Sequence, residues 1–224
     1  MNTSSSAPAS TPFSEGVITR NPAWVQMLGL CPLLAVSNSV VTSLGLAAAS
    51  AFVLVSSALL VSALRRQLPD FARLPAIMLI IAGATTLIVM LLEAFAFDLY
   101  SRIALFVQII VTNCVILGRA EAFASKNPVK LAVMDAAGTA TGFAVALISL
   151  GAVREMIGSG TLLARMDTLF GPAAANWMIT ILPADVTLLI AVLPPGAFII
   201  AGLLLALARA LSTRKSAGAP HAQR

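Results

Sequence analysis

The sequence is divided into six long apolar stretches that carry almost no charged residues. These stretches cover residues 23–37, 40–64, 74–92, 103–118, 131–153 and a longer one within 177–211. A soluble domain contains roughly 25% charged residues, whereas this chain contains 10% and is 59% hydrophobic. The apolar residues run on without alternating, which favours helices over strands, and helices satisfy their own backbone hydrogen bonds in hydrocarbon. We therefore predict an all-α integral membrane protein with one domain and six transmembrane segments.

The lengths of the stretches suggest an internal repeat. The first and fourth have 15 and 16 residues, which spans roughly 22–24 Å at helical rise and falls short of a ~30 Å hydrocarbon core. The others are long enough to cross. The order short-long-long therefore occurs twice, and two units of three spans have opposite orientations in the membrane. We predict a 3+3 inverted repeat, with halves at about 21–92 and 103–211 and with short, broken first and fourth segments.

The last stretch is punctuated by polar and proline residues. Pro183 and Asp185 precede a predicted span over about 186–207, and Pro194-Pro195 is expected to kink or unwind that span. Asp185 is interpreted as the beginning of the last helix. Residues 162–170 are expected to form a short amphipathic helix on the outer surface.

Basic residues predict the orientation. If the N-terminus is cytoplasmic, three of the 14 Lys and Arg residues lie outside, namely Arg102, Arg154 and Arg165. The other eleven then lie on the cytoplasmic side, as the positive-inside rule requires. We predict that both termini are cytoplasmic, with a disordered tail over residues 1–20 and a polar tail over residues 212–224.

The two cysteines of the chain lie in the two short stretches. Counting from the opposite ends at which these stretches enter the membrane, Cys31 lies ~12 Å deep and Cys114 ~16 Å deep. Both depths are near the middle of a ~30 Å core. Pro32 disfavours helical geometry at the residue before it, so Cys31 is expected at a helix break.

Two thiols at this depth allow several chemistries. Each could be a small buried apolar residue, and the two could form a disulfide, although membrane interiors rarely hold one. They could also hold a metal or an iron–sulfur cluster. A [2Fe–2S] cluster needs four thiolates, and the lone His221 lies in the polar tail. A cluster would therefore need two further cysteines from a second chain.

Four motifs resemble those of a known family of membrane subunits. They are N-P-A-W-V-Q-M-L-G-L-C-P-L-L-A-V (21–36), V-T-N-C-V-I-L-G-R-A-E-A-F-A-S-K-N-P (111–128), G-A-V-R-E-M-I-G-S-G-T-L (151–162) and L-P-P-G-A-F-I (193–199). Over about residues 20–211 the chain resembles the E-subunit family of the Rnf (Rsx) electron-transport complex, within the group that also includes the Rnf A subunit and the D and E subunits of Nqr. The Nqr D subunit is similar too, but it tends to have Ser after the first Cys, where this chain has Pro32.

The resemblance implies a subunit of an ion-translocating ferredoxin:NAD oxidoreductase of the bacterial inner membrane, with no catalysis of its own. It implies pairing with the Rnf A subunit, an inverted homologue, and assembly with the B, C, D and G subunits. It also implies that Cys31 and Cys114 ligate a midplane [2Fe–2S] cluster shared with the A subunit. Such a cluster would relay electrons across the membrane, coupled to movement of Na⁺ or H⁺.

Several charged residues have less specific interpretations. Glu93, Asp98 and Asp135 lie near the ends of predicted spans, where capping of a helix end competes with a role in an ion path. Two neighbouring pairs are interpreted as local ion pairs or docking surfaces: Arg119 with Glu121, and Arg154 with Glu155.

Two other classes of function stay open at this point. Inverted repeats and broken helices also serve secondary transporters, although no charged residue is predicted at the midplane to bind a substrate. A structural assembly subunit without a cofactor is the third possibility. Nucleic-acid binding is excluded, because the sequence has no basic stripe or aromatic platform.

Overall fold

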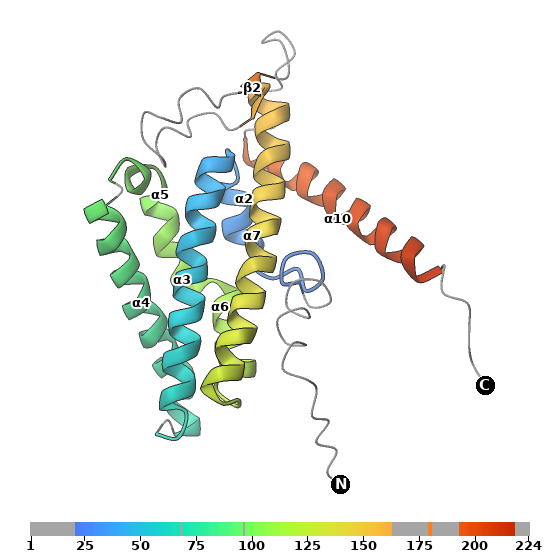
Figure 1. The fold of residues 1–224 in the computed structure, drawn as a ribbon. Coiled ribbons are helices and arrows are strands. Elements are labelled where there is room, and N and C mark those ends of the chain that lie inside the picture. The colour runs from blue at the N-terminus through green and yellow to red at the C-terminus, as the bar shows by residue number, and fades with distance from the viewer. Residues whose placement is uncertain (1–20, 68, 96, 163–178, 181–192, 218–224) are drawn as a thin grey trace, which may run out of the picture.

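The computed structural model describes residues 21–67, 69–95, 97–162, 179–180 and 193–217. Three long helices lie side by side and form the body of the molecule (Figure 1). They are α3 (Val40–Leu64), α4 (Arg73–Phe95) and α7 (Val129–Ser159). Shorter elements complete the bundle: α2 (Leu30–Val36), η2 (Asp70–Ala72), α5 (Phe97–Ile109), η3 (Ile110–Thr112), α6 (Cys114–Arg119) and a π-helical turn, η4 (Ala120–Ala124).

Four helical stretches in the described part of the chain are long and apolar enough to cross a membrane. They cover residues 40–64, 73–95, 106–124 and 129–159. The first coincides with the predicted second segment, and the other three overlap the predicted third, fourth and fifth. The helical character of the chain and its multiple apolar spans are confirmed.

Local sequence accounts for the ends of these helices. The side chain of Ser39 accepts a hydrogen bond from the backbone N–H of Thr42 at 3.3 Å and so caps the start of α3. Pro128 precedes the first residue of α7, and Gly160 follows its last residue with a φ of 66°. Proline before a helix and left-handed glycine after it suit these two positions.

The core lies between α3 and α7, where small side chains bring the two helices close together. A Cβ atom added to Gly151 on α7 would lie 2.4 Å from the hydroxyl oxygen of Ser43 on α3. Larger apolar residues, including Leu46, Val53 and Leu147, fill the buried space around this contact. Small residues at the closest approach of two helices are typical of membrane bundles.

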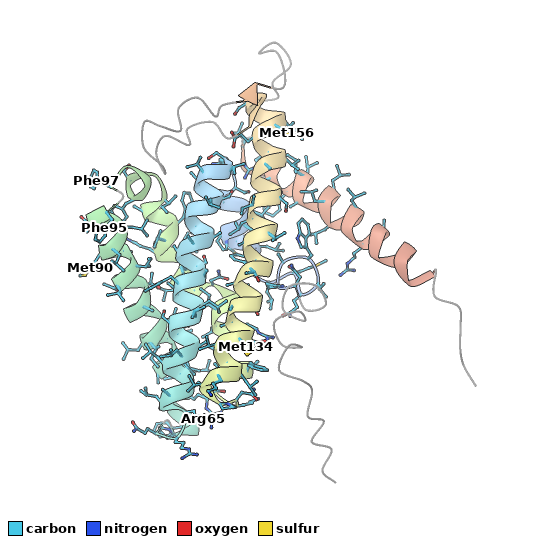
Figure 2. The ribbon with its side chains drawn as sticks, viewed as in Figure 1. Arg65, Met90, Phe95, Phe97, Met134 and Met156 are labelled. Carbon is cyan, nitrogen blue, oxygen red and sulfur yellow. The ribbon has the colours of Figure 1, made fainter. Side chains whose placement is uncertain are left out.

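The outer surface of α4 and α5 is apolar. Met90, Phe95 and Phe97 point away from the bundle (Figure 2), and their exposed fractions are 64%, 86% and 65%. A surface with so many large exposed apolar side chains is suited to lipid or to a partner chain rather than to water.

The C-terminal part differs from the prediction at one point. Helix α10 (Pro194–Ala217) begins at Pro194, so the Pro-Pro pair lies in a first helical turn, where no proline N–H group is needed. The first part of the predicted span, residues 186–192, lies outside the described residues. Thr161–Leu162 (β1) pairs antiparallel with Ile179–Thr180 (β2), a short ladder that the all-helical prediction did not include. Leu162 is therefore a strand residue, and the rest of the expected helix over 162–170 lies outside the described residues, as do Pro183 and Asp185. Helix α10 leaves the bundle at an angle (Figure 1).

Candidate functional site: two helix breaks and their cysteines

The first break is the non-helical segment over residues 21–29 that precedes α2, and Asn21 organises its turn. Its Oδ1 atom accepts hydrogen bonds from the backbone N–H groups of Ala23 at 3.1 Å and Trp24 at 3.2 Å. Its Nδ2 atom donates to the carbonyl oxygen of Gly142 in α7 at 3.2 Å. This one buried side chain therefore fixes the turn and attaches it to α7.

Two left-handed residues end the turn and set the start of α2. Met27 has a φ of 53°, and Gly29, the residue before the helix, has a φ of 72°. Cys31 and Pro32 both lie inside the first turn of α2. The prediction that Cys31 itself sits at the break was therefore wrong, because proline is tolerated in a first helical turn and the backbone reverses at Gly29 instead.

The second break separates α5 from α6. Helix α5 tightens into the 3₁₀ turn η3, and Asn113 then adopts an extended conformation with a φ of −67° and a ψ of 117°. The Asn113 Oδ1 atom accepts a hydrogen bond from the backbone N–H of Val115 at 3.0 Å and caps α6. Cys114 is the first residue of α6.

The two breaks are in direct contact. A Cβ atom added to Gly29 would lie 2.7 Å from Val115 Cγ2, 2.9 Å from Phe143 Cε2 and 3.3 Å from Asn113 Oδ1. Only a residue without a side chain fits at Gly29. Residues flanking both cysteines therefore touch, although 82 positions separate Cys31 from Cys114 in the sequence.

Both cysteines are free thiols and both are exposed. They are the only cysteines in the sequence. No group of three or more His, Cys, Asp or Glu residues that could hold a metal occurs in the described part of the chain. Both thiols are therefore accessible from outside the chain.

A cavity of about 560 Å³ opens beside the first cysteine. It is lined by Leu30, Cys31, Leu34, Ala35, Asn38, Phe106, Arg154 and Phe198. Most of these side chains are apolar, so Cys31, Asn38 and Arg154 supply the polar groups of the wall.

Arg154 and Glu155 of α7 both contact the segment that runs from the first cysteine helix to α3. Arg154 Nη1 donates to the carbonyl oxygen of Leu34 at 3.1 Å and to the hydroxyl oxygen of Ser37 at 2.9 Å. Glu155 Oε2 accepts from the backbone N–H of Val40 at 2.8 Å. Both side chains are 1% exposed, so the expected docking surface is absent at these two residues. They hold the connection between α2 and α3.

Arg119 at the end of α6 pairs with Asp135 of α7, not with its near neighbour Glu121. The Nε atom of Arg119 donates to Asp135 Oδ2 at 2.9 Å, and its Nη2 atom forms a salt bridge with Oδ1. The guanidinium also lies over the ring of Phe123. Glu121 is exposed. Asp135 therefore ties the helix that begins with Cys114 to α7.

The remaining candidate carboxylates are not brought to this site by the described structure. Glu93 is exposed in the last turns of α4. Asp98 lies in α5, but its side chain is outside the described set, and Asp185 lies outside the described residues, as does the lone histidine, His221.

Comparison with known proteins gives a consistent result across most of the chain. A family model described as "Rnf-Nqr subunit, membrane protein" matches residues 10–205. A protein of Pseudomonas paraeruginosa, named as the E subunit of an ion-translocating oxidoreductase complex, is 52% identical over 193 residues, which cover 86% of this chain and 81% of the relative. Proteins with the same name occur in Cellvibrio japonicus, 49% identical over 86% of this chain and 82% of the relative, and in Pasteurella multocida, 44% identical over 96% of both chains.

Proposed function

Because this chain belongs to the Rnf-Nqr family of membrane subunits, we propose that it relays electrons through a [2Fe–2S] cluster held in the membrane. Cys31 and Cys114 supply two of the four thiolate ligands, and an Rnf A subunit supplies the other two. The complex is a ferredoxin:NAD oxidoreductase of the bacterial inner membrane, coupled to movement of Na⁺ or H⁺. The single observation that carries this proposal is the contact between the two helix breaks at Gly29, Asn113 and Val115.

The donor set fits an iron–sulfur group. Thiolates are the usual ligands of [2Fe–2S] clusters, and four are needed. The chain offers two exposed thiols beside one contact. The buried Nδ2 atom of Asn113, next to Cys114, has no hydrogen-bond partner among the described residues. A buried donor of this kind is costly unless it finds an acceptor, and sulfur bound at the neighbouring cysteine would provide one.

When bound, such a cluster takes up and gives up one electron. The residues of this chain would hold the cluster in place and influence its redox potential. Gly29 permits the close approach of the two breaks, Asn113 caps the helix that begins at Cys114, and Asp135 holds Arg119 at the other end of that helix.

The helix directions support the 3+3 inverted repeat with six spans. In Figure 1, α3 and α4 run in opposite directions, as do the α5–α6 segment and α7. The segment that contains α2 precedes the first pair, and α10 follows the second. The two cysteine segments then run in opposite directions through the bundle, as related halves of an inverted repeat require.

The positions of the basic loops support a cytoplasmic location of both termini. The loop after α3 and the loop after η4 lie at the same end of the bundle (Figure 1). Arg65 Nη1 donates to the carbonyl oxygen of Lys126 at 3.3 Å, and Ser62 Oγ donates to that of Asn127 at 2.7 Å. This end also carries Arg66, Arg73 and Lys130, so the positive-inside rule assigns it to the cytoplasm.

The exposure of both thiols supports a partner at this face. A [2Fe–2S] cluster held by this chain alone would lack two of its four thiolate ligands, whereas an inverted homologue with two cysteine segments would supply them. We propose the Rnf A subunit in this role, with the B, C, D and G subunits as the rest of the complex.

The test is to purify the complex with Cys31→Ser or Cys114→Ser and to measure its iron content and its electron paramagnetic resonance spectrum after reduction. Ala35→Ser and Gly118→Ser are matched controls, because each places the same side chain one turn along the same helix without removing a thiol. We expect either cysteine variant to lose the signal of one [2Fe–2S] cluster and both controls to keep it. An unchanged spectrum in both cysteine variants would refute the proposal.

A further inference from the structure

Two short connections form the end of the bundle that was assigned to the cytoplasm. Residues 65–72 join α3 to α4, and residues 125–128 join η4 to α7. The connections touch, because Arg65 Nη1 donates to the carbonyl oxygen of Lys126 at 3.3 Å, and Figure 2 shows Arg65 at this end. Each of the four candidate spans begins or ends beside one of these connections. The connections therefore lie at the depth of the lipid headgroups.

Four basic side chains at this end are available to a ligand. They are Arg65, Arg66, Lys126 and Lys130, and none of them forms an ion pair with another residue in the described part of the chain. Arg66, Lys126 and Lys130 are exposed, and the hydrogen bond of Arg65 goes to a neutral carbonyl oxygen. Arg73 is not counted, because it has an interaction of its own within the chain.

Carboxylates are fewer at this end than basic groups. Glu121 of η4 is exposed, and Asp70 of η2 is the other carboxylate of these stretches, with its side chain outside the described set. Asp135 is paired with Arg119. An excess of positive charge therefore remains, and it attracts an anion such as a phosphate group.

Large apolar side chains are exposed beside these charges. The ring of Phe71, in the connection between α3 and α4, is 91% exposed. Leu64 and Leu74, at the ends of the two helices that this connection joins, are 39% and 46% exposed. Apolar surface of this kind is unfavourable in water and is stabilised at the boundary between headgroups and acyl chains.

The depth of the charges favours a lipid over an acidic protein as the ligand. Arg66 and Lys126 each lie two residues beyond the end of a candidate span, and Lys130 is the second residue of another. These side chains reach the headgroup layer and do not extend far beyond it. A protein in the cytoplasm would need groups that project past the headgroups.

We propose that this end of the bundle binds an anionic phospholipid of the cytoplasmic leaflet. Arg65, Arg66, Lys126 and Lys130 contact its phosphate, and Phe71 contacts its acyl chains. Basic residues immediately cytoplasmic of membrane helices attract anionic headgroups in this way. Because the basic residues come from both connections, the bound lipid also ties α3 to α7.

The experiment uses the full chain purified in a nonionic detergent. Native mass spectrometry measures the occupancy of the first bound phospholipid as its concentration is raised. The probes are dioleoyl phosphatidylglycerol, which is anionic, and dioleoyl phosphatidylcholine, which is zwitterionic and has the same acyl chains. We expect the wild type to bind phosphatidylglycerol at least about 25-fold more tightly, because each basic residue near an anionic surface contributes about fivefold.

Two variants separate the contributions of charge and apolar contact. Arg66→Gln combined with Lys126→Gln is expected to reduce the preference for phosphatidylglycerol about 25-fold. Phe71→Ser is expected to weaken the binding of both lipids about threefold or more. The matched control is Arg214→Gln combined with Lys215→Gln, which removes the same charge from the end of α10, away from the bundle (Figure 1), and is expected to keep the preference.

Equal affinity of the wild type for the two lipids would overturn the inference and would leave the basic end to an acidic protein. Equal losses in the double variant and its control would also overturn it, since only net charge would then matter. So would unchanged binding in Phe71→Ser, or displacement of the lipid by an excess of inorganic phosphate, which would indicate a site for the free anion. The experiment involves neither cysteine, so its outcome is independent of the function proposed above.

Discussion

Replacing Gly29 by alanine is expected to destabilise the protein by about 2–5 kcal/mol. Two terms contribute. The φ of 72° at Gly29 costs a residue with a Cβ atom about 1–2 kcal/mol. The new methyl group would also lie 2.7 Å from Val115 Cγ2 and 2.9 Å from Phe143 Cε2, and overpacking of this kind typically costs about 1–3 kcal/mol. Because Gly29 and Asn113 flank the two cysteines, relief of the clash would also push the two helix breaks apart.

The free energy of unfolding can be measured in mixed micelles with increasing fractions of sodium dodecyl sulfate, with tryptophan fluorescence as the signal. Gly118→Ala is the matched control, since a Cβ atom at Gly118 meets no heavy atom within 4 Å and alanine favours the helix by up to about 1 kcal/mol. We expect the free energy of unfolding of Gly29→Ala to be well below that of both wild type and Gly118→Ala. Equal stability of the two variants would show that the breaks do not touch as the structure has them.

Three further predictions concern the bundle around the site. Gly151→Ala is expected to lower the free energy of unfolding by about 1–3 kcal/mol, because its Cβ atom would lie 2.4 Å from Ser43 Oγ. The same micelle titration would contradict this if the variant were as stable as wild type. Asp135→Asn is expected to lower the free energy of unfolding by about 3–5 kcal/mol, because it leaves the largely buried Arg119 without its carboxylate. The double variant Asp135→Leu with Arg119→Met should recover most of this loss of stability. No recovery in the double variant would argue against the pair. Green fluorescent protein fused after residue 217 is expected to fluoresce, as it does in the cytoplasm, and a dark fusion with an active alkaline phosphatase counterpart would reverse the assigned orientation.

Hydrophobicity alone was sufficient to predict the long helices. The predicted second segment coincides with α3, because its ends are marked by Ser39 and by Arg65, and both signals are local. The predicted third segment differs from α4 by one residue at its start and three at its end. Charged residues and prolines at these ends limit each apolar run, so the local sequence specifies where these helices begin and end.

The helix breaks were only partly predictable. The short first segment and Pro32 indicated a break near Cys31, but the left-handed residues Met27 and Gly29 make it, and glycine is common enough that Gly29 gave no distinct signal. Asn113 before Cys114 is a favourable helix cap, and this signal in the sequence could have located the start of α6.

The buried polar contacts could not be predicted from sequence neighbours. The sequence suggests Glu121, two residues away, as a partner for Arg119, whereas the actual partner Asp135 comes 16 residues later. Arg154 binds Leu34 and Ser37, which lie 120 and 117 residues earlier in the chain. Such contacts depend on the packing of α2 against α7, which no local pattern specifies. Arg154 and Glu155 were expected to form a local ion pair or a docking surface, whereas both are buried. The signal for burial is that two adjacent charges lie inside an otherwise apolar span.

The central claim is that the two helix breaks bring Cys31 and Cys114 to one place. Because the chain contains no other cysteine, a short thiol-bridging reagent such as dibromobimane, which fluoresces when both of its arms have reacted, probes this pair directly in the membrane-embedded chain produced without its partners. We predict a fluorescent, internally bridged monomer for the wild type and none for Cys31→Ser or Cys114→Ser. A wild-type chain that reacts at both thiols yet forms no bridge within the monomer would contradict the account.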